Sequence, residues 1–280
     1  MTGPRQVVVV ADDFGASSAV NRAVLRAHCD GVVSAASLLV TGGAAAEAVA
    51  IARATPTLAV GLHLALADAT PALAPGEIAH LVDPDGLLPR SPARAFLRLT
   101  VSAAARHEAA REIAAQFARF DATGLPLSHV DGHHHLHLHP AVFREVAALA
   151  AARGARNVRL PWEGLRALKG ASPPGAAVEA LVLGALALRW RGEARRRGLA
   201  FAARVHGILR SGHMDAPYVR GLLPGLPPGI SEIFLHPSIT AEAPRGPNPG
   251  DLRAVLDPEL RAAFDGRTFA LSTFPPRRVT

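Results

Sequence analysis

Histidines crowd one short stretch of this chain, residues 128–140, which reads SHVDGHHHLHLHP. The stretch also contains one acid, Asp131, and ends at Pro140. Imidazole is the commonest side-chain ligand for transition metals and carries protons near neutral pH. So dense a cluster indicates metal binding or acid–base chemistry. Its six histidines are His129, His133, His134, His135, His137 and His139.

The flanks of this stretch predict where it lies in the fold. Residues 127–130 are typical of a short strand, and Pro140 can open a helix at its first position. The histidines would then lie in the loop beyond the carboxyl end of a strand. That is where α/β proteins hold their active sites.

Strands and helices alternate along nearly the whole chain, which predicts a parallel sheet with right-handed crossovers. Seven or eight such units in 280 residues fit a closed barrel better than an open sheet. No break in composition marks a second domain, so we predict that residues 1–280 form a single α/β domain. The predicted strands are residues 7–11, 35–40, 58–66, 127–130, 157–160, 201–205, 231–235 and 268–271.

Four sites of ionisable residues share a position near the carboxyl end of a predicted strand: Asp12 with Asp13, His63, the histidine stretch, and His236. In a parallel barrel these ends form one rim, so the groups would meet in one pocket. One Asp and two His there would bind a metal and leave positions open for water and substrate. The metal-site hypothesis depends on all four sites falling at the same end of successive strands.

Each of these sites also has a simpler explanation when it is taken alone. Asp12 and Asp13 could cap the helix that follows them. His63 could be a hydrogen-bonded core histidine, and the histidine stretch could be a biased segment. His236 with the proline after it says little by itself.

Composition restricts the environment and the partners. The net charge is +7, but no nucleic-acid motif accompanies it, so we expect no nucleic-acid partner. The single cysteine cannot form an internal disulfide. The first apolar run is very short and is followed by two acids, so we expect no signal peptide. No uncharged apolar stretch reaches the roughly 18 residues of a membrane helix. We therefore expect a soluble, cytoplasmic protein.

Six motifs occur in the order found in YdjC-like carbohydrate deacetylases: ADDFG, VNRAVLRAH, GLHLAL, SHVDGHHHLHLHP, VRLPWE and SEIFLHP. The chain resembles that family from about residue 7 to residue 271, most weakly between residues 164 and 197. The stretch GILRSGHMDAPYVRGLLPGLPPGISEIFLHP is most similar to the branch associated with hopanoid biosynthesis, usually called HpnK.

The resemblance implies a distorted (β/α) TIM-like barrel, one divalent metal ion, and hydrolysis of an N-acetyl group on a sugar. It implies that Asp13, His63 and His133 bind the metal. Asp12 would be the catalytic base, and His236 is the candidate acid. Family members are associated with Mg²⁺ in several cases, whereas two histidines and one aspartate suit Zn²⁺, so both ions stay open.

Four further residues are candidates for supporting roles. Asp131 could bond a ligating imidazole from behind. His135, like His137, could orient the ligands or contact substrate, and Trp162 could stack on a sugar face. Packing and loop hydrogen bonds are the alternative for each of them.

We therefore predict a metal-dependent N-deacetylase that acts on an N-acetylglucosamine unit, with a hopanoid lipid as one candidate carrier. The apolar run at residues 180–188, with arginines after it, could contact such a lipid or an anionic bilayer surface, or could be an ordinary packed helix. Peripheral membrane contact and a homodimer are left open. The rival functions are a metal-dependent phosphoesterase, although the ligand motifs contain no Lys or Arg, and a non-catalytic metal-binding protein that holds several ions.

Overall fold

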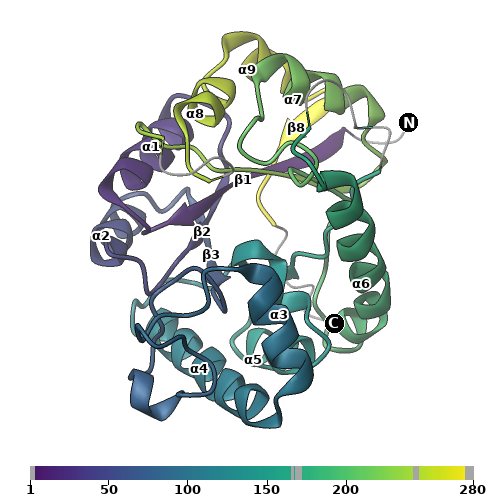
Figure 1. The fold of residues 1–280 in the computed structure, drawn as a ribbon. Coiled ribbons are helices and arrows are strands. Elements are labelled where there is room, and N and C mark those ends of the chain that lie inside the picture. The colour runs from purple at the N-terminus through teal and green to yellow at the C-terminus, as the bar shows by residue number, and fades with distance from the viewer. Residues whose placement is uncertain (1–3, 165–166, 168–171, 242–245, 275–280) are drawn as a thin grey trace.

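The computed structural model describes residues 4–164, 167, 172–241 and 246–274, and its strands form one curled parallel sheet (Figure 1). The hydrogen-bonded order is β5-β4-β3-β2-β1-β7-β6, and β8 pairs with β1. The strands are β1 (Arg5–Phe14), β2 (Ala35–Leu38), β3 (Ala59–Leu64), β4 (His129–Gly132), β5 (Asn157–Val158), β6 (Arg204–His206), β7 (Ile230–Leu235) and β8 (Phe269–Leu271).

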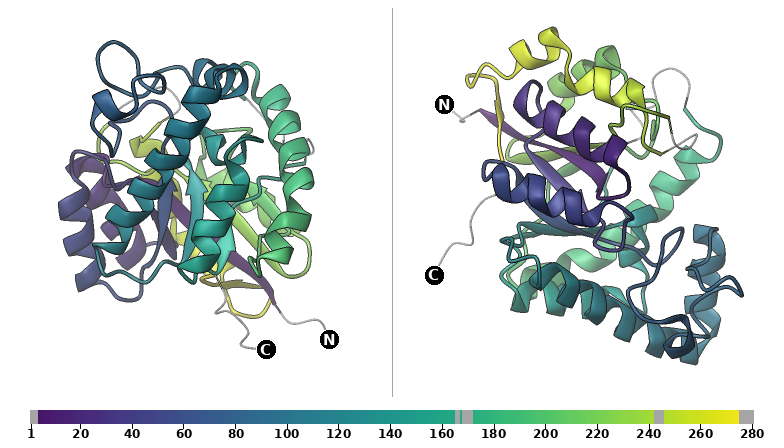
Figure 2. Two further views of the ribbon diagram at one scale, coloured as in Figure 1. Left: turned by 90° about the horizontal axis from the view of Figure 1, so that it is seen from below. Right: turned by 90° about the vertical axis from the view of Figure 1, so that its left-hand side faces the viewer.

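Helices surround the strands, as the two views of Figure 2 show. None of the described helices is long and apolar enough to cross a membrane. The α-helices are α1 (Ser18–Cys29), α2 (Ala45–Ala54), α3 (Pro92–Val101), α4 (Ala103–Asp121), α5 (Phe143–Ala152), α6 (Ala176–Arg196), α7 (Ala216–Leu222), α8 (Pro249–Val255) and α9 (Pro258–Ala263). Short 3-10 turns are η1 (Pro75–Glu77), η2 (His133–Leu138) and η4 (Leu223–Gly225).

Burial explains the pattern of β1 and α1. Residues 7–14 of β1 are all buried, because the side chains on one face of the strand point into the barrel and those on the other face contact the helices. Ser17 caps α1 by accepting a hydrogen bond from the amide of Val20, and the buried residues of α1 repeat at helical spacing. The core is therefore continuous from the strand interior to the helix layer.

The predicted distorted TIM-like α/β barrel is confirmed, and each predicted strand has a counterpart. The ring is not closed by a ladder, however, since β5 and β6 are the two ends of the strand order. An isolated bridge between Asn157 and Ala200 crosses this gap. Strand β5 has only two residues, and Pro161 shortly after it lacks an amide hydrogen that could extend the pairing. The sheet is thus a half-barrel.

One local prediction is wrong. Pro140 does not open a helix, because the chain first forms η2 and α5 begins at Phe143. Most of the stretch from residue 164 to 197, where the family resemblance is weakest, is α6, although residues 165, 166 and 168–171 lie outside the described residues. Between β3 and α3 the chain forms a long connection, and Glu108 and Glu112 of α4 anchor it by accepting hydrogen bonds from its backbone amides.

Candidate metal centre

Two adjacent carboxylates lie at the carboxyl end of β1. The pairing register with β2 shifts between Ala11 and Phe14, and Asp13 has a left-handed backbone with φ of 60°. Such an irregularity lets consecutive side chains leave the normal alternation of a strand. Left-handed non-glycine residues are strained, and they cluster at functional sites. As a result Asp12 and Asp13 can both serve one pocket.

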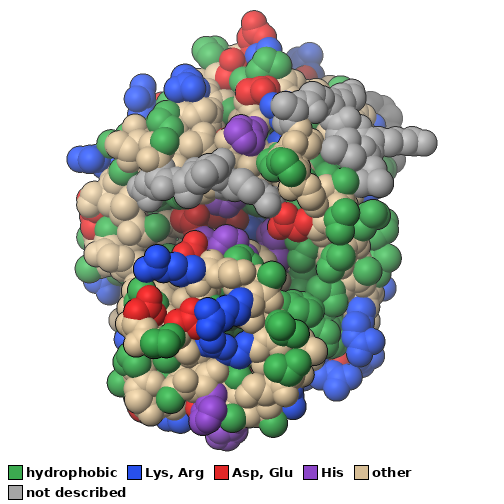
Figure 3. Space-filling view, in the orientation of Figure 1, with side chains coloured by type: hydrophobic (Ala, Val, Ile, Leu, Met, Phe, Trp, Pro, Cys, Tyr) green, Lys and Arg blue, Asp and Glu red, His purple; other side chains and the backbone are tan. Residues whose placement is uncertain are grey.

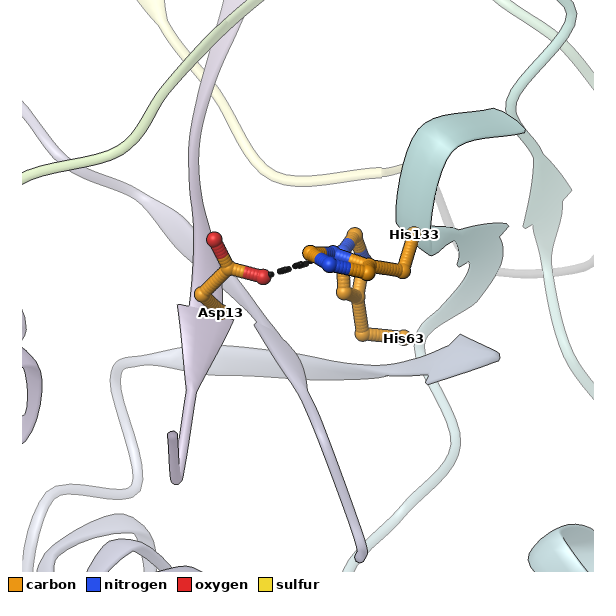
Figure 4. Close-up of side chains that lie close together, drawn as sticks. All are labelled: Asp13, His63 and His133. Carbon is orange, nitrogen blue, oxygen red and sulfur yellow. Dashed lines mark hydrogen bonds and ion pairs between the residues drawn. The ribbon is translucent and has the colours of Figure 1, made fainter. Parts of the chain in front are cut away.

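Asp13, His63 and His133 meet at this pocket, although β1, β3 and η2 each contribute one of them (Figure 4). Asp13 Oδ1 lies 3.0 Å from His133 Nδ1 and 3.4 Å from His63 Nε2, and the two nitrogens are 3.3 Å apart. Asp13 and His63 are buried, whereas His133 is half-buried. Figure 3 shows a hollow in this face of the molecule with acidic and histidine side chains at its bottom.

The three donor atoms fit a single cation. Divalent ions bond to such ligands at about 2.0–2.2 Å, which puts neighbouring ligand atoms about 3.0–3.4 Å apart. The observed separations lie in this range. Asp13 Oδ1 is buried and accepts no well-formed hydrogen bond within the described chain, and a buried acceptor in this condition costs free energy. A bound cation would satisfy it.

Asp131 of β4 orients one of these imidazoles. Its Oδ1 accepts a hydrogen bond from His63 Nδ1 at 2.8 Å, which leaves Nε2 directed at Asp13 and His133. Burial lowers the pKa of His63, but the carboxylates of Asp131 and Asp13 outweigh burial and raise it to about 10. Metal-free His63 is therefore protonated at neutral pH, and a cation must displace the proton on Nε2.

The same electrostatics act on Asp13. Burial raises the pKa of Asp13, but His133 and His63 outweigh it and hold that pKa well below the usual range. The carboxylate is therefore ionised across the neutral range, as a metal ligand must be. The site combines one anionic oxygen with two imidazole nitrogens.

Arg159 joins this centre, and sequence reasoning missed it. It follows β5 and is 1% exposed. Its guanidinium donates to both oxygens of Asp12, at 2.6 and 2.8 Å, and to Glu232 Oε1 at 2.5 Å, and it forms an ion pair with Asp131 Oδ2 at 2.8 Å. A charge this deeply buried is tolerated only with such partners. The available signal was an arginine between Val158 and Leu160 in a predicted strand.

Glu232 of β7 was missed in the same way, as a lone acid in an apolar strand. Burial raises the pKa of Glu232 to about 7 in spite of the neighbouring Arg159. Its Oε2 has no hydrogen-bond partner in the part of the chain that the structure describes. Glu232 thus balances the charge of Arg159 from the barrel interior.

His236 lies across the pocket from Asp12, directly after β7. Its Nε2 is 4.0 Å from Asp12 Oδ2, and its side chain is 13% exposed. Its backbone amide donates to Asp251 Oδ2 at 2.9 Å, which fixes the turn that follows the strand. The structure therefore brings the His236 imidazole close to the Asp12 carboxylate.

Of the residues predicted to have supporting roles, His135 has an unpaired ring nitrogen within the described chain, whereas His137 and Trp162 make packing or backbone contacts. His135 is buried in a left-handed conformation with φ of 57°, and its Nδ1 has no hydrogen-bond partner within the described chain. His137 donates from Nε2 to the carbonyl of Arg159 at 2.9 Å, so it holds backbone and does not face the cluster. The half-buried ring of Trp162 lies against Gly184 of α6, where an added Cβ would come within 3.2 Å of the ring. These contacts favour packing for His137 and Trp162.

Fold and site together define an α/β half-barrel protein with a candidate metal centre at the carboxyl ends of its strands. Residues 6–266 match the family model described as YdjC-like protein, and the chain belongs to this family. The chain also resembles the crystal structure of a putative cellobiose-phosphate cleavage protein from Enterococcus faecalis V583. That likeness has a TM-score of 0.74 and 22% identity over 97% of this chain and 98% of the other, and it concerns the fold alone.

Curated relatives match about half of the chain. A carbohydrate deacetylase from Brevibacillus brevis is 39% identical over 157 residues, which cover 56% of this chain and 60% of that protein. A carbohydrate deacetylase from Geobacillus stearothermophilus is 39% identical, covering 56% and 64%. A chitooligosaccharide deacetylase from Serratia marcescens is 38% identical, covering 53% and 56%. In each case the matched segment spans less than two thirds of the relative.

Proposed function

We propose that this chain is a metal-dependent carbohydrate N-deacetylase. The observation that carries the proposal is the pairing of two sets of residues at one opening: Asp13, His63 and His133 as a ligand set, and Asp12 opposite His236. The deacetylase names of the relatives support it.

The chemistry of amide hydrolysis assigns a task to each set. A divalent cation held by Asp13, His63 and His133 would supply a Lewis acid that activates water and polarises the acetyl carbonyl. Asp12, whose two oxygens are fixed by Arg159, would accept the proton of the attacking water. Arg159 thereby acts as a positioning residue, because it fixes the plane of the Asp12 carboxylate.

His236 would serve as the general acid. An amine leaves poorly unless it is protonated, and an imidazole is suited to donate that proton near neutral pH. The 4.0 Å between His236 Nε2 and Asp12 Oδ2 is too long for a direct hydrogen bond. Each group can therefore exchange a proton with the substrate or the attacking water and not with the other group.

The resident ion is proposed to be Zn²⁺ or Mg²⁺. One carboxylate oxygen and two imidazole nitrogens are donors that zinc accepts readily, whereas magnesium prefers oxygen and retains water. The other two candidate ligand groups in the described residues each share one histidine, His63 or His133, with this set, so an ion held by Asp13, His63 and His133 would leave neither of them complete. This favours one ion per chain over the several ions that a metal-storage protein would hold.

We propose an N-acetylglucosamine unit as the substrate, with a lipid such as a hopanoid as its carrier. Exposed apolar side chains of α6 support a lipid: Val178, Leu181, Val182 and Leu188 are 65%, 59%, 52% and 47% exposed. Figure 3 shows an apolar surface beside the hollow, where Figure 1 draws α6. Apolar patches of this kind are typical of contact sites for apolar ligands or membranes.

A phosphoesterase fits the centre less well. Phosphate recognition relies on arginine or lysine side chains that are free to donate. Arg159 reaches this centre but is already engaged by the carboxylates of Asp12, Asp131 and Glu232. A phosphate would have to displace these partners inside a fully buried network.

The deciding experiment is an acetate-release assay on N-acetylglucosaminyl hopanoid and on N,N′-diacetylchitobiose, with Zn²⁺ and Mg²⁺ varied. Phosphate release from phosphorylated sugars is measured in parallel, and bound metal is counted by elemental analysis. We expect acetate release, no phosphate release, and one ion per chain. Phosphate without acetate would support the phosphoesterase, and several ions without turnover would support metal storage.

Three broader statements stay predictions of the sequence. They are that residues 1–280 make up one domain, that the protein works in the cytoplasm, and that nucleic acid is not a partner. Peripheral membrane contact and a homodimer stay open. Light scattering of the purified chain, with and without lipid vesicles, would test the last two.

A further inference from the structure

A line of buried hydrogen bonds continues behind Asp131 toward the other end of the barrel. Ser37 of β2 places its Oγ 2.6 Å from Asp131 Oδ2 and 3.0 Å from His129 Nε2. Ser37 and Asp131 are 0% exposed and His129 is 1% exposed. No part of the proposed reaction uses Ser37 or His129, so their connection to the centre needs its own explanation.

The direction of each hydrogen bond follows from the chemistry of the groups. A carboxylate only accepts, so the Ser37 hydroxyl donates to Asp131. The serine oxygen is then left to accept from His129, which puts the His129 proton on Nε2. Burial lowers the pKa of His129 to about 4, so its ring is neutral, and its Nδ1 has no partner among the described residues. The line therefore runs from His129 through Ser37 to Asp131.

Asp131 is held by three partners from distant parts of the chain. His63 donates to Oδ1 and Ser37 donates to Oδ2, whereas the Arg159 guanidinium forms an ion pair with Oδ2 at 2.8 Å. A carboxylate fixed in this way cannot rotate, and its orientation sets the plane of the His63 ring. The direction of His63 Nε2 toward Asp13 and His133 therefore depends on the Ser37 hydroxyl.

The far end of the line is clamped by packing. An added Cβ at Gly61 would come within 2.5 Å of the His129 ring, so β3 approaches this ring as closely as glycine allows. On another side the ring of Phe274 lies 4.6 Å from that of His129. His129 can therefore neither turn nor shift, and Ser37 receives a fixed donor.

We propose that Ser37 is a positioning residue of the metal centre, which holds Asp131 so that His63 presents Nε2 to the cation. The inference rests on the proposed function, because it requires that Asp13, His63 and His133 bind a metal. Outer partners of ligating histidines typically contribute 10–100-fold to metal affinity. Ser37 would act on binding, whereas the proton-transfer groups would stay unchanged.

Ser231 of β7 offers a matched control. It is also 0% exposed and lies on a strand of the same sheet, but its Oγ has no hydrogen-bond partner within the described chain. Ser37→Ala and Ser231→Ala thus each remove one buried hydroxyl from the sheet interior. They differ in whether that hydroxyl reaches Asp131.

The test compares wild type, Ser37→Ala, Ser231→Ala and Ser37→Cys, all stripped of metal. Zn²⁺ affinity is measured by competition with a chelator, and the absorption spectrum of the Co²⁺ form reports the ligand field. We expect Ser37→Ala to weaken Zn²⁺ binding by about 10-fold or more and to alter the Co²⁺ spectrum. Ser37→Cys, of similar volume but a weak donor, should lie between it and wild type.

Activity of Ser37→Ala should recover at saturating metal, because the proton-transfer groups are intact. Wild-type affinity and an unchanged Co²⁺ spectrum in both Ser37 variants would overturn the inference. An equal loss in Ser231→Ala would overturn it too, since the effect would then be general to the sheet. Failure of the wild type to bind any divalent ion would instead overturn the proposed function, and this inference with it.

Discussion

The two ends of β4 use histidine in opposite ways. At its carboxyl end, His133 faces Asp13 Oδ1, a buried acceptor with no hydrogen bond among the described residues, and Asp13 and the two residues after His133 have left-handed backbones. At the amino end of β4, which we call the floor of the barrel, His129 donates to Ser37 and packs against Gly61 and Phe274. Both belong to the same stretch of sequence. His133 is thus a candidate ligand because it lies beside other potential ligand atoms, whereas His129 is packed in the core with one ring nitrogen bonded to Ser37.

The strongest test of this contrast removes a candidate ligand at the carboxyl ends of the strands, which we call the mouth of the barrel. Asp13→Ala or His133→Ala should abolish metal binding and reduce acetate release by at least about 1000-fold, because metal catalysis supplies several kcal/mol of barrier reduction. Elemental analysis and the acetate assay measure the two effects. His107→Ala, an exposed histidine of α4, is the control and should match wild type. Metal retained at wild-type level in both ligand variants would contradict the assignment.

The next test separates binding from proton transfer within the mouth. Asp12→Asn should keep the metal but lower kcat by about 10²–10⁴-fold, since the amide cannot accept the proton of water. Arg159 can still donate to the remaining carbonyl oxygen, whereas its other donor then faces the amide NH2 group and loses its acceptor. Metal content and kcat are measured on the same sample. An Asp12→Asn enzyme with full turnover would mean that another group is the base.

A pH series sharpens the comparison further, because the pKa values of the two histidine environments shift in opposite directions. The pKa of metal-free His63 is raised from 6.5 to about 10, so a cation must displace its proton at neutral pH. Apparent Zn²⁺ affinity should therefore rise about tenfold per pH unit between pH 6 and 8. Chelator competition at each pH measures this affinity. Asp131→Asn should make the affinity depend less steeply on pH. A pH-independent affinity in wild type would show that metal-free His63 is not protonated at neutral pH.

The same raised pKa affects the stability of the metal-free chain. Because the folded pKa of His63 exceeds the unfolded one, its ion pairs contribute their full stabilisation below about pH 6.5 and lose it as the pH rises through about 10. Urea unfolding of metal-free protein across this window should show the decline. In Asp131→Asn the decline should be smaller and begin at lower pH.

The smallest effect on the metal centre is expected at the floor. Phe274→Ala removes a ring that is 1% exposed and packs on His129, so it should lower the free energy of unfolding by about 3–5 kcal/mol. Zn²⁺ affinity should change by less than about threefold, because Gly61 still confines the His129 ring. Urea unfolding and chelator competition measure the two quantities. A large loss of Zn²⁺ affinity in Phe274→Ala would show that packing around His129 affects the candidate metal ligands more strongly than the hydrogen bonds between them indicate.

The sequence by itself determined the alternation of strands and helices and the positions of the ionisable side chains along it. Local periodicity indicates which residues of each element are buried. The apolar run at residues 7–11 therefore predicts a buried strand, and the spacing of apolar residues in α1 is that of a helix. The strand ends grouped the Asp12–Asp13 pair, His63, the histidine stretch and His236, and the family resemblance implied that Asp13, His63 and His133 are the ligands. A parallel sheet then requires that these ends share one rim.

Only the tertiary structure decided which polar atoms have partners. Arg159 meets Asp12 across 147 residues, and Ser37 meets Asp131 across 94. No local pattern records such pairs, because each residue looks like an isolated polar group in an apolar strand. The opening between β5 and β6 depends in the same way on how two distant segments approach. Hydrogen bonding and burial of charge are properties of atoms brought together by folding, and residue spacing along the chain does not contain them.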